Sequence, residues 1–348
     1  MFKAQYVRRD FIFKEAGGTS RGVLRTKPSW LIKISSENGD VGIGECSIIP
    51  GLSIEDSPLL EKKIEEVCTD IEQYANDYQT SLVDYPALRF ALETAFTGLA
   101  NGSTYTLFDS DFVNLSKPIT INGLIWMGEQ AEMLKRIEEK LSKGFKCLKL
   151  KVGAIDFNKE LELLSTIRKN YSAKELELRV DANGAFSFSS AMDKLSALAK
   201  YDIHSIEQPI AAGQYEAMYH LCQQSPIAVA LDEELIGIKH CDEKRRLLET
   251  IQPQYIILKP SLIGGFKSSN EWIELAEQLN VGWWATSALE SNIGLNAIAQ
   301  WVYTKNNSLR QGLGTGQVFT NNIKSPLYLD GDQLYYGEEN CWENPFSN

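Results

Sequence analysis

Hydrophobic and polar positions alternate in the first fifty residues, as they do in half-buried β-strands. Three such stretches, with turn signals between them, cover residues 2–13, 23–36 and 41–49. The period then changes, because apolar residues recur at helical spacing over 53–74 and 85–99. Strands followed by helices predict a small α+β domain at the start of the chain.

From about Pro118 onward, strand-like and helix-like segments alternate regularly. Eight strand-like segments cover residues 120–128, 145–153, 176–184, 203–210, 227–235, 255–265, 281–291 and 310–316. A helix-like segment separates each pair of neighbours, which predicts an α/β fold with a (β/α)₈ TIM-like barrel of parallel strands. A doubly wound open sheet is the alternative, but no G-x-G-x-x-G follows an early strand, so its dinucleotide-binding form has no support.

The changes of pattern also suggest where the domains divide. We expect an α+β domain over 1–115 and the barrel, as the catalytic domain, over 116–324. The stretch YLDGDQLYYG near the C-terminus has strand character. We therefore expect the tail, about 325–348, to return to the first domain and complete it.

Charged residues interrupt the expected barrel strands, although a buried strand should be nearly all apolar because burying a charge is expensive. In chain order they are Lys149 and Lys151, then Arg179 and Asp181 followed by Asn183, then Glu207, Asp232 and Lys259. Counted from Lys151, the late charges of successive strands follow at steps of 30, 26, 25 and 27 residues, one βα unit each time. Residues two apart share a face of a strand, and the carboxyl ends of barrel strands form the active site, so we expect these side chains to meet there.

The carboxylates of Asp181, Glu207 and Asp232 would lie on three neighbouring strands and repel one another without a cation. They offer only oxygen ligands, with no His or Cys among them, which favours Mg²⁺, with Mn²⁺ as the alternative. On spacing alone, Glu233 and Glu234 compete with Asp232 as ligands.

The lysines flank these carboxylates, with Lys149 and Lys151 before them and Lys259 after them. A lysine base beside a metal suits removal of a carbon-acid proton next to a carboxylate, because the metal can hold the enediolate that forms. The neighbouring cations Lys149, Arg179 and the metal should lower the pKa of Lys151 and supply a neutral amine. The alternative is that these lysines lie at strand edges and extend their ammonium groups into solvent.

The motifs K-x-K, D-x-N, E-x-P, D-E and K-P at these spacings resemble the enolase superfamily, in its muconate lactonising enzyme subgroup, over nearly the whole chain. The resemblance implies that the first domain caps the barrel and that Mg²⁺ binds to Asp181, Glu207 and Asp232. It also implies that Lys151 takes the proton and returns one to a departing hydroxide, while Lys259 stabilises the enediolate from the opposite face. The catalytic set is thus Lys149, Lys151 and Lys259, with Arg179, Asn183 and Glu233 orienting these groups. The stretch TSALESNIGL resembles the S-x-x-E-S-x-x-G of the family, so Ser287 should contact the substrate.

Two absences from the motifs narrow the reaction that the resemblance implies. The segment GLGTG (312–316) lacks the D-x-D of dipeptide epimerases, and no His stands in the seventh strand as in mandelate-racemase-like members. The remaining expectation is a lyase that dehydrates 2-succinyl-6-hydroxy-2,4-cyclohexadiene-1-carboxylate to 2-succinylbenzoate in menaquinone biosynthesis. N-acylamino acid racemase is the alternative, because it uses the same lysine pair. A barrel that binds a ligand without catalysis is a remote one.

Charge and cysteine content limit the partners and the compartment. The net charge of −11 disfavours nucleic acid and anionic membranes, whereas local lysines and a metal can still attract a small-molecule carboxylate. The start MFKAQYVRRDF lacks the apolar segment of a signal peptide, and no apolar run is long enough to cross a bilayer, so we expect the cytoplasm. None of the six cysteines forms a C-x-x-C pair, so we expect reduced core thiols. Monomer and homo-oligomer both remain open.

Overall fold

The computed structural model describes residues 1–19, 22–153, 155–337 and 341–347. Its first sheet contains β1 (Phe2–Thr19), β2 (Gly22–Ser36) and β3 (Val41–Ser47), antiparallel and in that order. The strands expected from alternation are therefore confirmed. Helix α4 (Pro86–Ala100) packs directly on β3, where a Cβ atom at Gly44 would lie 1.9 Å from the carbonyl oxygen of Ala91. Glycine at this position thus allows the close approach of helix and sheet.

The helices of this first unit are short, apart from α4. They are α1 (Leu60–Thr69), α2 (Ile71–Tyr74), α3 (Tyr78–Ser81) and, beyond α4, α5 (Asp111–Asn114). The helix expected from residue 53 begins only at Leu60, so this boundary was wrong. The side chains of Ser53 and Asp56 accept the backbone N–H groups of Ile49 and Gly51, and these bonds hold the chain in turns before the helix.

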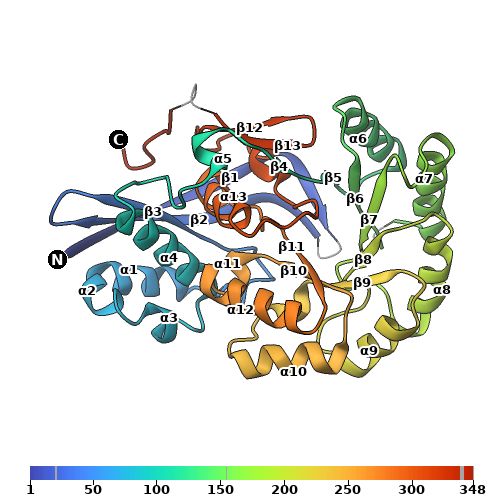
Figure 1. Cartoon of the computed structure of the whole chain (residues 1–348), viewed down its shortest axis with the longest axis horizontal. Helices are drawn as coiled ribbons and strands as arrows, with labels where there is room; N and C mark the ends of the chain where they lie inside the picture. Colours follow the sequence, from blue (N-terminus) through green and yellow to red (C-terminus); the bar gives the residue numbers. More distant parts are fainter. Residues whose placement is uncertain (20–21, 154, 338–340, 348) are drawn as a thin grey trace.

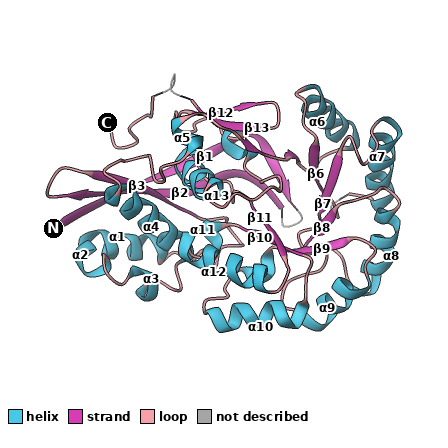
Figure 2. Cartoon of the chain, viewed as in Figure 1, coloured by secondary structure: helices cyan, strands magenta, loops and turns pink. Residues whose placement is uncertain are grey.

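A curled parallel sheet follows, with α6 to α10 arranged along its outer side (Figures 1 and 2). Its strands, from one edge to the other, are β5 (Gly123–Ile125), β6 (Cys147–Lys151), β7 (Glu177–Asp181), β8 (Ser205–Glu207), β9 (Ala228–Leu231), β10 (Tyr255–Leu258) and β11 (Gly282–Ala285). The long helices between and after them are α6 (Gln130–Ser142), α7 (Phe157–Asn170), α8 (Phe188–Ala199), α9 (Tyr215–Gln224), α10 (Cys241–Ile251), α12 (Gly265–Gln278) and α13 (Asn292–Tyr303). The predicted alternation of parallel strands and helices is confirmed for these segments.

The eighth strand, expected over 310–316, is not a regular strand in the described structure. Gln311 instead forms an isolated parallel bridge to Ile121, and Gly312 forms one to Thr286. Ile121 precedes β5 and Thr286 follows β11, so the two bridges lie between the edge strands of the sheet. The segment then turns into the 3-10 helix η2 (Gly314–Gln317), and its glycines explain why a longer strand does not form.

The C-terminal tail forms the hairpin β12 (Leu327–Asp330) and β13 (Gln333–Tyr336), which pairs with β4 (Ile119–Thr120). Beyond the hairpin, the Trp342 ring stacks on Tyr105 with 4.2 Å between ring centroids. The tail therefore contacts both the start of the parallel-sheet region and the segment that follows α4.

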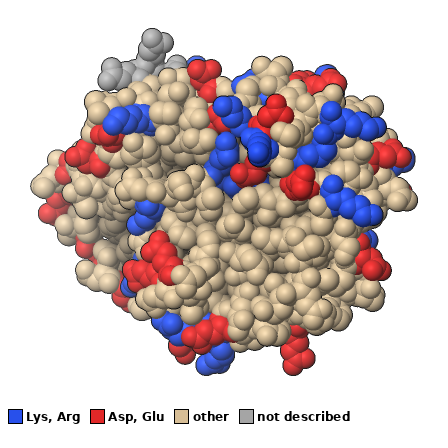
Figure 3. All heavy atoms as spheres, turned by 45° about the vertical axis from the view of Figure 1, so that its right-hand side comes forward, with Lys and Arg blue, Asp and Glu red and all other residues tan. Residues whose placement is uncertain are grey.

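The described surface and the cysteines can be compared with the expectations from charge and cysteine content. On the face seen in Figure 3, basic and acidic side chains are interspersed. No helix in the described ranges is both long and apolar enough to cross a membrane. The cysteines are unpaired, but Cys241 and Cys341 are exposed, so the expectation that all six lie in the core was wrong.

Candidate active site

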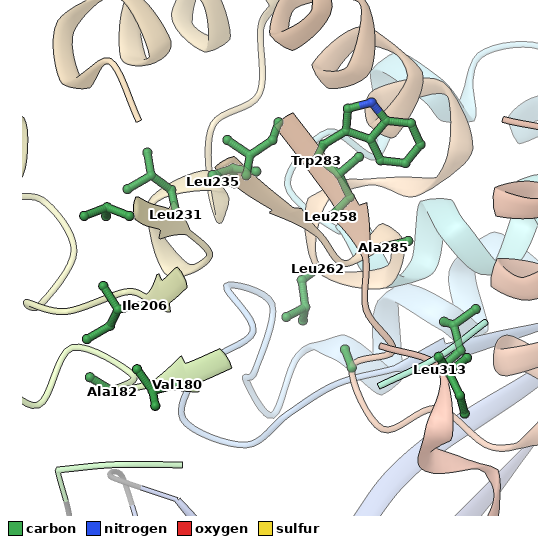
Figure 4. Close-up of a cluster of buried hydrophobic side chains, with 14 of the residues drawn as sticks. Val180, Ala182, Ile206, Leu231, Leu235, Leu258, Leu262, Trp283, Ala285 and Leu313 are labelled. Carbon is green, nitrogen blue, oxygen red and sulfur yellow. The ribbon is translucent and has the colours of Figure 1, made fainter. Parts of the chain in front are cut away.

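Strand alternation separates the charged residues from the apolar core. Val180 and Ile206 belong to the hydrophobic cluster around the sheet (Figure 4), and they alternate with charged residues along β7 and β8. In the sheet register Lys151 lies beside Asp181, and Asp181 lies beside Glu207. Neighbouring strands therefore bring these three side chains to the same level on the inner face.

The lysines and carboxylates form one buried cluster. The Lys149 ammonium lies 2.5 Å from Oε2 of Glu207 and 2.8 Å from Oδ2 of Asp181. The Lys151 ammonium lies 2.6 Å from the same Asp181 oxygen. On the other side, Lys259 donates to Asp232 and lies 3.8 Å from Oε1 of Glu207. All of these side chains are buried, so the structure brings together the lysines and carboxylates that spacing predicted.

Burial and neighbouring charges move the lysine pKa values in different directions. Burial lowers the pKa of Lys151, and the positive charge of Lys149 lowers it further. Together these two effects outweigh the negative charge of Asp181, which raises the pKa. This is the direction expected from sequence, although burial is the largest cause. Burial favours a lower pKa for Lys259 as well, but the negative charges of Asp232 and Glu207 outweigh this effect. The pKa of Lys259 is therefore raised above its usual value. The pKa of Lys149 is raised for the same kind of reason.

The carboxylates fit a hard divalent cation. Burial, together with the charges of Asp181 and Asp232, raises the pKa of Glu207 to about 8. Its Oε1 atom is buried and has no hydrogen-bond partner among the described residues. An oxygen-only donor set with an unsatisfied buried acceptor suits Mg²⁺. Within the described ranges no group of three or more acidic, His or Cys side chains is spaced to hold a metal ion, and Lys149 and Lys259 occupy oxygens for which a cation would compete.

Asn183 connects the Lys151 ammonium to Glu233. Its Oδ1 atom accepts a hydrogen bond of 2.7 Å from Lys151, and its Nδ2 donates one of 3.1 Å to Glu233. Glu234, which competed on spacing as a ligand, instead accepts the backbone N–H of Gly213 at 2.9 Å. The geometry thus separates the three consecutive acidic residues, and Asp232 is the one that contacts Lys259.

Arg179 lies one inward position before Asp181 and has other contacts. Its Nε donates to Glu177 at 2.7 Å, and its Nη1 donates to the carbonyl of Arg310 at 3.0 Å. The guanidinium lies over the Trp284 ring, 4.2 Å from the centroid. These contacts are at the opposite end of the strand from the carboxylate cluster.

A cavity of about 170 Å³ lies beside the cluster. Lys149, Lys151 and Lys259 line it together with Ser287, whose hydroxyl donates to Oε2 of Glu290 at 2.5 Å. Lining residues that sequence reasoning did not single out are Leu24, Ile49, Asn122, Trp126 and Thr315. Most are apolar or come from the first unit, so the charge pattern could not identify them. A polar Asn122 in an otherwise apolar stretch was the one available signal.

Comparisons with known proteins show the family of the chain. The family model described as "Enolase C-terminal domain-like" matches residues 132–328. The o-succinylbenzoate synthase of Desulfotalea psychrophila is 47% identical, covering 94% of this chain and 97% of that protein. The crystal structure of MenC from the same organism superposes with a TM-score of 0.84 at 44% identity, covering 96% of this chain and 99% of that one.

A more distant structure shares the fold alone. The dipeptide epimerase of Enterococcus faecalis, solved with Mg and the dipeptide L-Leu-L-Tyr, has a TM-score of 0.82 at 21% identity, with 97% of each chain covered. The resemblance inferred from the sequence motifs is confirmed by the family model and by the D. psychrophila relative. The chain belongs to the enolase superfamily and, within it, to the family of the o-succinylbenzoate synthases.

Proposed function

We propose that the protein is a Mg²⁺-dependent o-succinylbenzoate synthase, a lyase of menaquinone biosynthesis. It would convert 2-succinyl-6-hydroxy-2,4-cyclohexadiene-1-carboxylate to 2-succinylbenzoate and water. The observation that carries this proposal is the placement of Lys151 and Lys259 on either side of three carboxylates, with both lysines lining one cavity. Family membership supplies the substrate.

The proposed scaffold is a (β/α)₈ barrel over 116–324, in which Gln311 and Gly312 take the place of the eighth strand. The bridges of these two residues to Ile121 and Thr286 support closure of the sheet. Residues 1–115 and the tail 325–348 would form the capping domain, and the lining of the cavity by Ile49 from the first unit supports that role.

Asp181, Glu207 and Asp232 would hold the metal, with Mg²⁺ as the expected ion and Mn²⁺ as the alternative. When bound, the ion supplies Lewis-acid stabilisation of negative charge on the substrate carboxylate. The epimerase of E. faecalis was solved with Mg, which supports a similar ion here.

The lysines would perform the proton transfers and the electrostatic stabilisation. Neutral Lys151, favoured by its lowered pKa, takes the proton from the carbon that bears the carboxylate, and the C–H electron pair moves into the enediolate. The pair then returns as the ring C–O bond breaks, and the Lys151 ammonium protonates the leaving hydroxide to water. The raised pKa of Lys259 keeps it an ammonium that stabilises the enediolate, while Asn183 orients Lys151 through its 2.7 Å hydrogen bond.

The test is turnover of the cyclohexadiene substrate by the purified protein, with and without metal. We expect dehydration with Mg²⁺, its loss after treatment with EDTA, and its recovery when Mg²⁺ is restored. Mg²⁺ should also raise the melting temperature, because a ligand that binds only the folded state stabilises it. Racemisation of N-succinylated amino acids without dehydration would instead identify an N-acylamino acid racemase, and inactivity on both would favour a barrel that only binds ligands.

A further inference from the structure

A second buried carboxylate, outside the metal and base set, lies behind the cavity wall. Glu290 is fully buried, and both of its oxygens accept side-chain hydrogen bonds. One oxygen accepts from the hydroxyl of Ser261, and the other accepts from Ser287 at 2.5 Å. Ser261 stands two residues after Lys259, and Ser287 stands two residues after the end of β11. One carboxylate thus joins the ends of two neighbouring strands.

The Ser261 bond fixes the turn that carries Lys259. Lys259 is the residue from which the short helix α11 (Pro260–Ile263) begins, and its carbonyl accepts the N–H of Leu262 at 2.8 Å. Ser261 lies in this single turn and is itself fully buried. A change in the orientation of the turn would move the Lys259 side chain, whose ammonium must remain beside Asp232.

The chemistry of this position favours a carboxylate. Two hydroxyl donors need two acceptors, and a glutamine would offer only one, so one buried serine would lose its partner. A buried anion also needs a nearby positive charge. Lys27 of β2 is buried, and Glu45 and Glu290 are the carboxylates whose charges act on it most strongly.

The same contacts extend to the cavity. Thr315 lines the cavity and donates to the Ser287 hydroxyl at 2.8 Å, so the bonds form a directed series from Thr315 through Ser287 to Glu290. We propose that Glu290 is a positioning residue that holds Lys259, through Ser261, and the hydroxyl of Ser287 in their working geometry. The effect of Glu290 on turnover rests on the proposed function, whereas its effect on the placement of Lys259 does not.

The test compares Glu290→Gln, Ser261→Ala and the double variant. Glu290→Gln should lower kcat by about 30-fold and change KM by less than about 3-fold, because misplacement of a stabilising group acts mainly on the transition state. Ser261→Ala should lower kcat by about 10-fold, and the double variant should resemble Glu290→Gln, because both changes break the same link. Ser269→Ala is the matched control, since Ser269 is an equally buried serine that bonds only a backbone carbonyl in α12, and its kcat should stay at the wild-type value.

Crystal structures of Ser261→Ala and Glu290→Gln give a readout independent of turnover. We expect the Lys259 ammonium to move away from Asp232 in both. An unmoved Lys259 with wild-type kcat, or effects that multiply in the double variant, would overturn the proposal. If Glu290→Gln does not fold, Ser261→Ala alone decides by the same criteria. If the wild type does not dehydrate the substrate but Lys259 moves in the variants, the proposed function fails and the positioning role stands.

Discussion

The two ends of the parallel sheet both bury charges, but they pair them differently. At the amino ends of the strands, Arg179 pairs with Glu177 at 2.7 Å, a carboxylate that Arg310 also approaches at 3.4 Å, and its guanidinium lies over Trp284, 4.2 Å from the ring centroid. At the carboxyl ends, a single oxygen of Asp181 receives two ammonium groups, at 2.8 and 2.6 Å. Buried polar atoms without a hydrogen bond in the described structure occur at both ends, Oε1 of Glu207 at the carboxyl end and Nη2 of Arg179 at the amino end.

This difference separates a structural pair from a site that can do chemistry. A guanidinium held by a carboxylate, a backbone carbonyl and an aromatic face stabilises the fold. Shared and unsatisfied carboxylates beside a cavity push neighbouring pKa values apart, as seen in the lowered pKa of Lys151 and the raised pKa of Lys259. Substitutions at the carboxyl end should therefore affect rate, and those at the amino end should affect stability.

The largest expected effect is at the carboxyl end, where Lys151→Ala removes the proposed base. Dehydration should fall by at least about 10³-fold, because the other lysines that line the cavity, Lys149 and Lys259, have raised pKa values and do not supply a neutral amine. Lys146→Ala is the matched control, since Lys146 is an exposed lysine just before β6. It should retain wild-type turnover. Steady-state kinetics with Mg²⁺ and circular dichroism of both variants make the measurement, and turnover above a tenth of wild type in Lys151→Ala would exclude it as the base.

At the amino end, Arg179→Leu should cost stability and leave the chemistry almost intact. Removing Arg179 takes from Glu177 its nearer partner, at 2.7 Å against 3.4 Å for Arg310, so the free energy of unfolding should fall by about 3 kcal/mol. The kcat should remain within about 5-fold of wild type, because the contacts of Arg179 are remote from the cavity. Urea unfolding and kinetics on the same preparation provide the measurement.

Arg310→Leu is the control for this change. Arg310 is 29% exposed in its side chain and lies 3.4 Å from Glu177, so its loss should matter less. If the kcat of Arg179→Leu falls below the range expected above, the amino end also supports catalysis. The distinction between the two ends would then be lost.

The carboxyl-end cluster could be predicted from the sequence, because charged residues are unusual in apolar strands and these recur at the spacing of one βα unit. Asp181 and Arg179 lie on the same face of β7, however, and alternation indicates the face without indicating which end a side chain approaches. The structure was therefore needed to show that the surroundings of Asp181 and Arg179 differ. The role of Glu290, the acidic residue of the S-x-x-E-S-x-x-G stretch, was missed because Glu290 follows β11 and its partner Ser261 lies in α11, outside the strands to which alternation applies. The eighth strand is reduced to the bridges of Gln311 and Gly312, because the glycines at 314 and 316 favour a turn over a longer ladder.

The smallest expected effect tests what burial does when no lysine is near. Glu55 is buried like Asp181, but burial raises its pKa to about 7, opposed chiefly by the backbone N–H of Ala87, whereas the lysines hold the pKa of Asp181 well below its usual range. Below the pKa of the unfolded chain, Glu55 is protonated in both states. As pH rises toward 7 the unfolded state ionises first, so the stability that Glu55 contributes is lost across this window.

Glu55→Gln stays neutral and can still accept the 2.6 Å bond from Ala87, so between pH 5 and pH 8 the wild type should lose about 2 kcal/mol relative to this variant. Urea unfolding at both values, with the exposed Glu65→Gln as the control, measures the difference, and an equal pH dependence in Glu55→Gln and wild type would show that burial alone does not set the charge of this carboxyl.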